Sequence, residues 1–230
     1  MTYVIEPTPR VSIPVTHGGG LFPVNKIYCV GRNYAEHAIE MGADPDRELP
    51  FFFMKPGYAV LTGGVDMIYP NHSKDVHHEV ELVVALAKGG SDISVADAMT
   101  LVFGYGVGVD MTRRDLQGEA KEDRRPWEAG KTFRHAAPCS DLVPIAESNE
   151  INSGAISLSI NGQVRQSGDI NQMIWKVPEV ISRLSELFFL QPGDLIFTGT
   201  PAGVGPVHRG DLINASIVDV ISLSFRIGSS

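Results

Sequence analysis

Short apolar or alternating segments, separated by turns rich in Gly and Pro, dominate the chain and predict a protein built mainly of β-strands. The clearest hairpin covers residues 155–168, where the alternation turns at Asn161 and Gly162. Strands do not alternate regularly with helices, so we expect an α+β fold that is mainly β. The other predicted strands occupy residues 26–31, 50–56, 75–86, 104–112, 193–199 and 210–216.

Helical periodicity is confined to a few short segments. The best of them covers residues 177–189, with Pro178 in the first turn and apolar residues recurring on one face. A second helix is predicted over residues 34–41, capped by Asn33 and closed by Gly42. Two further segments predict a helix and a short polar helix or turn, at 94–102 and 113–123.

Length and charge bound the class of protein. The 230 residues suffice for one domain with a well-buried core. Residues 1–25, rich in Pro and Gly, predict an N-terminal arm packed on a single domain formed by residues 26–230. A net charge of −8 argues against nucleic acid as a partner, because nucleic acid attracts a basic surface.

Cysteine usage and the N-terminus predict a cytoplasmic protein. Cys29 and Cys139 lie among apolar or small residues and form no closely spaced pair, so we expect buried, reduced thiols. The N-terminus lacks a basic start followed by an apolar stretch, so no secretory signal is visible. No apolar run approaches the ~20 residues that a membrane span needs, so we expect no membrane contact.

Carboxylates interrupt an otherwise apolar strand in "DVHHEVELVVAL", residues 75–86. Alternate residues of a strand share a face, so Glu79 and Glu81 should point the same way. Two such charges beside a core repel each other and lose hydration, and a positive group should lie between them. Asp110 ends the face of "GYGVGVD" that carries only glycine, and it could join them in an all-oxygen site for Mg²⁺, Mn²⁺ or Ca²⁺. The alternative is that all three carboxylates are exposed at strand ends.

A histidine and a glutamate lie three residues apart in "HAIE", at His37 and Glu40. On a helix they would share a face, and a carboxylate that orients an imidazole can make it a general base near neutral pH. The alternative is an exposed helical pair without a role.

Four further polar residues could bind or stabilise an anionic ligand. Arg114 and Gln117 share one side of a predicted helix, and arginine can hold a carboxylate with two hydrogen bonds, although a surface arginine is the alternative. Lys131 would neutralise clustered carboxylates and could stabilise a developing enolate. Thr200 lies in the glycine-rich turn "FTGTPAGVG", which lacks the ending of a phosphate-binding loop, so its hydroxyl could hold a carboxylate instead.

Taken together, six segments resemble the fumarylacetoacetate hydrolase family, and the short length resembles its acylpyruvase branch. They follow the family order over residues 26–213: "VGRNYAEHAIEMG", "FFFMKP", "HHEVELVV", "GYGVGVDMTRRDLQ", "PWEAGKTF" and "LQPGDLIFTGTPAGVG". The resemblance implies a mixed β-roll or sandwich of that family's C-terminal-domain type, with a few short flanking helices and a homodimeric assembly. It makes residues 26–230 the catalytic domain.

The same resemblance assigns roles to ten residues. The metal ligands would be Glu79, Glu81 and Asp110, holding Mg²⁺ or Mn²⁺, with Ca²⁺ also possible. The catalytic residues would be His37, Glu40 and Lys131. The substrate-binding residues would be Arg32, Arg114, Gln117 and Thr200.

The activity that the resemblance implies is metal-dependent hydrolysis of the carbon–carbon bond of a 3-acylpyruvate, a small anionic diketo acid. Fumarylpyruvate, which occurs in gentisate-type aromatic degradation, would give fumarate and pyruvate. One alternative is decarboxylation of an oxaloacetate-type acid, or isomerisation of a diene-dioate, on the same metal-enolate scaffold. A second alternative is a non-catalytic metal- or ligand-binding module, which would need the three carboxylates but not the His37–Glu40 pair.

Overall fold

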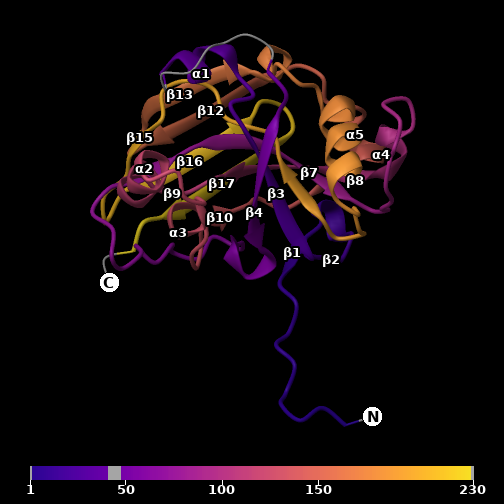
Figure 1. The fold of residues 1–230 in the computed structure, drawn as a ribbon, viewed down its shortest axis with the longest axis horizontal. Helices are drawn as coiled ribbons and strands as arrows, with labels where there is room; N and C mark the ends of the chain where they lie inside the picture. Colours follow the sequence, from indigo (N-terminus) through magenta and orange to yellow (C-terminus); the bar gives the residue numbers. More distant parts are fainter. Residues whose placement is uncertain (1, 41–47, 229–230) are drawn as a thin grey trace.

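A mixed sheet of six strands forms the centre of the fold (Figure 1). The computed structural model describes residues 2–40 and 48–228. In this sheet β14 pairs parallel with β3 and antiparallel with β7, and the other neighbours are antiparallel. The order across the sheet is β11 (Val143–Pro144), β8 (Val102–Val109), β7 (Val80–Leu86), β14 (Leu195–Phe197), β3 (Lys26–Gly31) and β4 (Phe51–Pro56).

A second, antiparallel sheet packs on β7 and β8 and completes a mainly β fold, as the sequence predicts. Its buried positions alternate with more exposed ones along β12 and β16, which is the pattern of a sheet with one face on the core. The predicted hairpin is confirmed, because Asn161 and Gly162 take φ angles of 52° and 81° in its turn. The strands, in order, are β13 (Gln163–Asp169), β12 (Ala155–Ile160), β16 (Leu212–Ile217) and β17 (Ile221–Arg226).

The prediction of one continuous strand over residues 75–86 is wrong, because the segment changes sheet at Glu79. Residues before this point form β6, which pairs with β15 and β9, whereas β7 pairs with β8 and β14. The carbonyl of Glu79 accepts a hydrogen bond from the Asp110 N–H at 2.8 Å. The smaller sheets contain β15 (Gly205–Pro206), β6 (Val76–His78) and β9 (Thr112–Arg113); β1 (Ser12–Pro14) and β2 (Leu21–Pro23); β5 (Val60–Leu61) and β10 (Ala137–Pro138).

Short helices flank the sheets (Figure 1). The predicted helix at 177–189 is confirmed as α5, with Pro178 in its first turn. The α-helices are α1 (Ala35–Glu40), α2 (Arg114–Glu122), α3 (Glu128–Lys131), α4 (Ile145–Ser148) and α5 (Val177–Leu187). The 3₁₀ helices are η1 (Thr16–Gly18), η2 (Gly57–Ala59), η3 (Ala98–Leu101) and η4 (Ile170–Gln172).

Two helical predictions need correction. Residues 94–102 contain only the 3₁₀ helix η3, because the Ser94 hydroxyl bonds the backbone N–H and the carboxylate of Asp97 and closes a local turn instead. The Asn33 side chain does not cap α1, since its amide bonds the backbone of Trp175 and Thr198. The predicted helix end at Gly42 lies outside the described residues.

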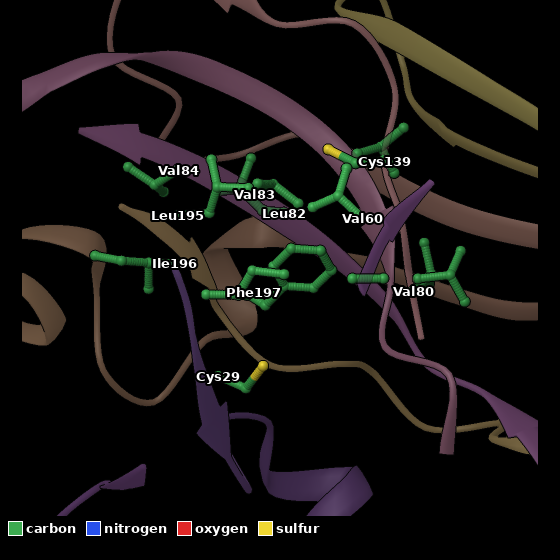
Figure 2. Packing of buried hydrophobic residues seen from close by; sticks show 14 of the residues in the cluster. Cys29, Val60, Val80, Leu82, Val83, Val84, Cys139, Leu195, Ile196 and Phe197 are labelled. Atoms are coloured by element: carbon green, nitrogen blue, oxygen red, sulfur yellow. The ribbon is translucent and has the colours of Figure 1, made fainter. Parts of the chain in front are cut away.

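Packing in the core leaves little space between the strands (Figure 2). Every residue of β7 is buried, so this strand is covered on both faces. Other parts of the protein pack closely against the face of β8 that carries only glycine. A Cβ on Gly104 would overlap the Val143 carbonyl, and one on Gly108 would lie 2.7 Å from the Phe197 ring. Cys29 and Cys139 are buried free thiols, as predicted.

The N-terminal segment is partly inserted in this core. Ile13 and Phe22 are buried, whereas residues 2–10 are exposed and extend away from the body (Figure 1). None of the helices in the described part of the chain has the length and apolar character that crossing a bilayer needs.

Candidate active site

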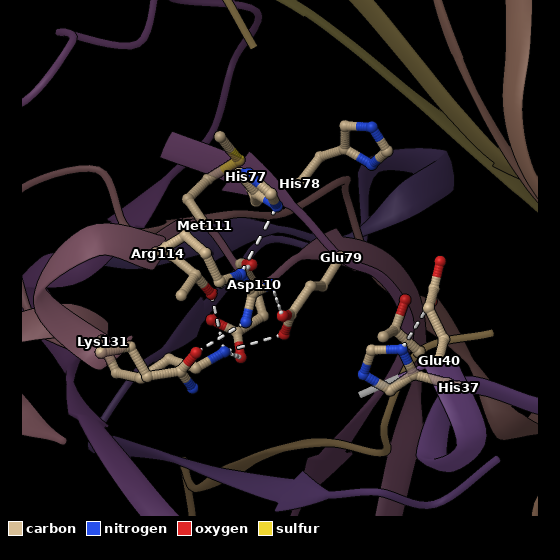
Figure 3. A network of polar contacts seen from close by, with 12 residues as sticks. His37, Glu40, His77, His78, Glu79, Asp110, Met111, Arg114 and Lys131 are labelled. Atoms are coloured by element: carbon tan, nitrogen blue, oxygen red, sulfur yellow. Dashed lines mark hydrogen bonds and ion pairs between the residues drawn. The ribbon is translucent and has the colours of Figure 1, made fainter. Parts of the chain in front are cut away.

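Three buried carboxylates, those of Glu79, Glu81 and Asp110, meet where the central strands begin and end. Figure 3 shows Glu79 and Asp110 with their polar contacts. The β7–β8 register pairs Val80 with Val109, which places Glu79 and Glu81 beside Asp110. One carboxylate oxygen from each residue lies within 4.8 Å of the others. Their exposed fractions are 5%, 2% and 0%, so the alternative of exposed strand ends is wrong.

Positive groups compensate two of the three carboxylates. The Lys131 ammonium donates hydrogen bonds to Glu79 Oε2 and Asp110 Oδ2, each at 2.8 Å, and to Thr112 Oγ1 at 2.7 Å. The Arg114 guanidinium donates to the other Glu79 oxygen. Burial alone would raise the pKa of Glu79, but the two cations hold this pKa well below its ordinary value. Burial would lower the pKa of Lys131, yet Asp110 and Glu79 raise it above the ordinary lysine range.

The third carboxylate, Glu81, has much less compensation. Its carboxylate accepts a hydrogen bond from the Gly199 N–H at 2.7 Å, and it forms no ion pair with any residue that the structure describes. Burial and the nearby charges of Asp110 and Glu79 raise the pKa of Glu81 well above its ordinary value. A hard divalent cation prefers carboxylate oxygens and would relieve this repulsion, so the three residues fit such an ion.

His37, from α1, lines the same pocket as the carboxylates, and Glu40 of the same helix contacts its imidazole (Figure 3). Nδ1 of His37 lies 3.1 Å from Glu40 Oε2, and the Glu40 carboxylate also accepts from the Gly203 N–H at 3.2 Å. This contact leaves Nε2 of the imidazole for the pocket. His37 is only 6% exposed, so the alternative of an exposed pair is wrong for the imidazole.

Nine of the ten predicted site residues line one pocket, and the tenth, Glu40, lies behind His37. Arg114 and Gln117 share a face of α2 and are joined by a hydrogen bond of 2.6 Å. The Arg114 side chain is 14% exposed, so it is not a surface arginine. Arg32 adopts a left-handed backbone, with φ of 57°, immediately after β3. The nine are Arg32, His37, Glu79, Glu81, Asp110, Arg114, Gln117, Lys131 and Thr200.

Comparison with known proteins decides the family. Residues 26–228 match the family described as fumarylacetoacetate (FAA) hydrolase C-terminal. The chain belongs to the fumarylacetoacetate hydrolase family. The resemblance seen in the sequence is therefore confirmed.

Relatives in this family carry different activities in their names. The crystal structure of fumarylpyruvate hydrolase from Pseudomonas aeruginosa, in complex with Mn²⁺ and pyruvate, is 46% identical, covers 100% of both chains and superposes with a TM-score of 0.97. A fumarylpyruvate hydrolase from Ralstonia sp. is 41% identical over 82% of this chain and 98% of its own length. The mitochondrial oxaloacetate decarboxylase of Dictyostelium discoideum is 44% identical over 84% of this chain and 88% of its own.

Sequence reasoning missed two buried residues that support the site. Gln166 is fully buried: its side-chain carbonyl accepts from Val80 N–H and contacts His78 Nδ1, and its amide donates to Thr200 Oγ1 and to the Pro201 carbonyl. The alternation in "QVRQSG" marks Gln166 only as a strand residue, since its partners are remote in the sequence.

Lys55 is the second missed residue. Its ammonium lies 2.8 Å from Asp110 Oδ1 as an ion pair, although the angle is not that of a hydrogen bond. It also donates to the carbonyls of Met111, Lys131 and Ala136, at 3.0, 2.5 and 3.0 Å. A lysine at the end of the apolar run "FFFMK" is the signal that could have identified it, because burial of a lysine needs such partners.

Proposed function

We propose that this protein hydrolyses the carbon–carbon bond of a 3-acylpyruvate, and that fumarylpyruvate is its substrate, giving fumarate and pyruvate. The observation that carries the proposal is the His37–Glu40 pair facing the buried carboxylate triad across one pocket. The relatives named fumarylpyruvate hydrolase, at 41% and 46% identity, support the same substrate.

The chain's own residues have separate tasks in this reaction. Glu79, Glu81 and Asp110 would hold the divalent cation, Mg²⁺ or Mn²⁺, which supplies Lewis-acid polarisation of the keto acid when bound. His37 accepts a proton from water at Nε2, while Glu40 holds Nδ1 and stabilises the imidazolium.

The water oxygen attacks the carbonyl carbon of the acyl group, and the bond between this carbon and the pyruvate methylene breaks. The electron pair passes to the methylene carbon, which takes up a proton to give pyruvate. Lys131 places positive charge beside the fragment on which this negative charge develops. Arg114, Gln117 and Thr200 bind the carboxylate of the pyruvate part, and Arg32 contacts the acyl part.

Decarboxylation of oxaloacetate is the second candidate, because the relative from Dictyostelium discoideum is 44% identical. This reaction develops the same negative charge but needs no attacking water. A general base that is held by a carboxylate and faces the pocket therefore favours hydrolysis.

In the deciding experiment the purified protein is loaded with Mg²⁺ or Mn²⁺ and incubated separately with fumarylpyruvate, maleylpyruvate, acetylpyruvate and oxaloacetate. The products of each reaction are then identified. Two acids from an acylpyruvate support hydrolysis, whereas carbon dioxide from oxaloacetate alone would refute it.

His37→Ala should lower hydrolysis by about 10²- to 10⁴-fold, the usual contribution of a general base. His208→Ala, at an exposed position, is the matched control. Retention of full activity by the His37 variant would exclude this residue as the base.

The proposal also covers the location of the protein in the cell and its assembly. We propose a cytoplasmic homodimer in which residues 1–25 form an N-terminal arm, packed through Ile13 and Phe22 on the catalytic domain of residues 26–230. Sedimentation of the purified protein and fractionation of the source cells test the two statements, and a monomer or a membrane-bound fraction would contradict them.

A further inference from the structure

The pocket contains two cationic side chains without an anionic partner. Arg32 and Lys121 both line it, and neither forms an ion pair or hydrogen bond within the described ranges 2–40 and 48–228. Burial, together with the charges of Arg32 and Arg114, lowers the pKa of Lys121, in agreement with three cations gathered on one side of the pocket. Unpaired cations around a cleft attract an anion.

The geometry of α2 separates these cations into two groups. Arg114 and Lys121 are seven residues apart on this helix, so they share a face. At 1.5 Å per residue their backbones are roughly 10 Å apart along the axis. Arg114 is bonded to Glu79 and belongs to the deep end of the pocket, whereas Lys121 is exposed and belongs to its mouth.

An aromatic wall connects the two ends. Phe51, Phe53 and Trp127 line the same pocket, and the Phe51 and Trp127 rings meet edge to face, with centroids 5.2 Å apart. The Arg32 guanidinium lies 5.6 Å from the centroid of Phe51, and the Lys131 ammonium lies 4.9 Å from that of Phe53. Rings of this kind pack well on a flat, conjugated chain.

We propose that Arg32 and Lys121 bind a second carboxylate, at the far end of the acyl chain, and so make the enzyme selective for 3-acylpyruvates that are dicarboxylic acids. The inference rests on the proposed function, because the pyruvate part must occupy the deep end. A flat chain along the aromatic wall then brings a terminal carboxylate to the mouth. An uncharged acyl group, as in acetylpyruvate, leaves both cations unpaired.

The test replaces Lys121 and Arg32 by Met, singly, and uses Lys88→Met at an exposed position outside the pocket as the matched control. For each variant kcat and KM are measured with fumarylpyruvate and acetylpyruvate. The Kd for fumarate, as a non-hydrolysable dicarboxylate, is measured by calorimetry. Loss of one charged hydrogen bond at a partly exposed site should raise KM for fumarylpyruvate about tenfold. For Lys121→Met, KM for acetylpyruvate should stay within about twofold. For Arg32→Met it should rise less than KM for fumarylpyruvate, because Arg32 also contacts the acyl part.

The outcomes separate this inference from the proposed function. A selective rise in KM for fumarylpyruvate, or a selective weakening of fumarate binding, supports the mouth site. An equal change for both substrates, or no change in any of these constants, overturns it. If the wild-type protein hydrolyses neither acylpyruvate, the proposed function fails, and the fumarate measurement still decides whether the two cations bind a carboxylate.

Discussion

Replacement of Gln166 by Leu should damage both stability and the site, because this side chain is fully buried and makes four polar contacts. At about 1 kcal/mol for each hydrogen bond, the loss amounts to ~4 kcal/mol of unfolding free energy. Gln163→Leu is the matched control, since Gln163 is an exposed glutamine on the same strand and should cost less than about 0.5 kcal/mol.

Urea unfolding measures the stability part of this prediction, and the split between kcat and KM measures the positional part. The Gln166 amide donates to Thr200 Oγ1, so the Thr200 hydroxyl proton stays available to the pocket. Without this bond the hydroxyl can turn, and KM should rise at temperatures where the variant is still folded. Equal stabilities for the two glutamine variants, or an unchanged KM for Gln166→Leu, would refute the reasoning.

The remaining predictions concern the two buried thiols, the aromatic wall of the pocket and the carboxylate cluster. Burial raises the pKa of the Cys29 thiol and raises that of Cys139 to about 12, so neither should react with a thiol reagent until the protein unfolds. The unfolded chain releases these protons near pH 9 and the folded chain keeps them, so unfolding free energy should fall as pH rises from about 9 to 12, and less so in Cys139→Ala. Gly31→Ala would place a Cβ 2.0 Å from Cζ of the Phe51 ring, which the ring must move to avoid. The substitution should therefore lower stability by about 1–3 kcal/mol, measured by thermal unfolding, and raise KM; an unchanged stability and KM would contradict the described wall. Mn²⁺ at 100 times its Kd should stabilise the wild type by about 2.7 kcal/mol, measured by thermal unfolding, and should not stabilise Glu81→Ala; equal shifts would exclude Glu81 as a ligand.

Features that depend on neighbours in the sequence were predictable. The turn at Asn161 and Gly162 and the first turn of α5, which contains Pro178, follow from the conformations that these residues prefer, and both are found. The grouping of Glu79 and Glu81 was also predictable from their spacing of two residues, and it survives although the strand breaks at Glu79, because Glu79 immediately precedes β7.

Features that depend on remote partners were not predictable. The break at Glu79 arises because the residues on its two sides pair with different sheets, and nothing local marks this point. The contacts of Gln166 join residues up to 88 positions apart, so its burial is set by tertiary structure alone. At residues 94–102 the helical pattern was genuine, but the Ser94 hydroxyl offered the backbone a competing turn.

The parallel pairing of β3 with β14 has a consequence for how activity is acquired during folding. Cys29 is the register partner of Phe197, so the strand that leads to α1, although it also pairs with β4, completes its pairing only after most of the chain has been synthesised. Closing so long a loop is slow compared with forming the β12–β13 hairpin. Recovery of turnover on dilution from denaturant should therefore lag behind the first appearance of β-structure, and ribosome-bound chains that end before β14 should be inactive.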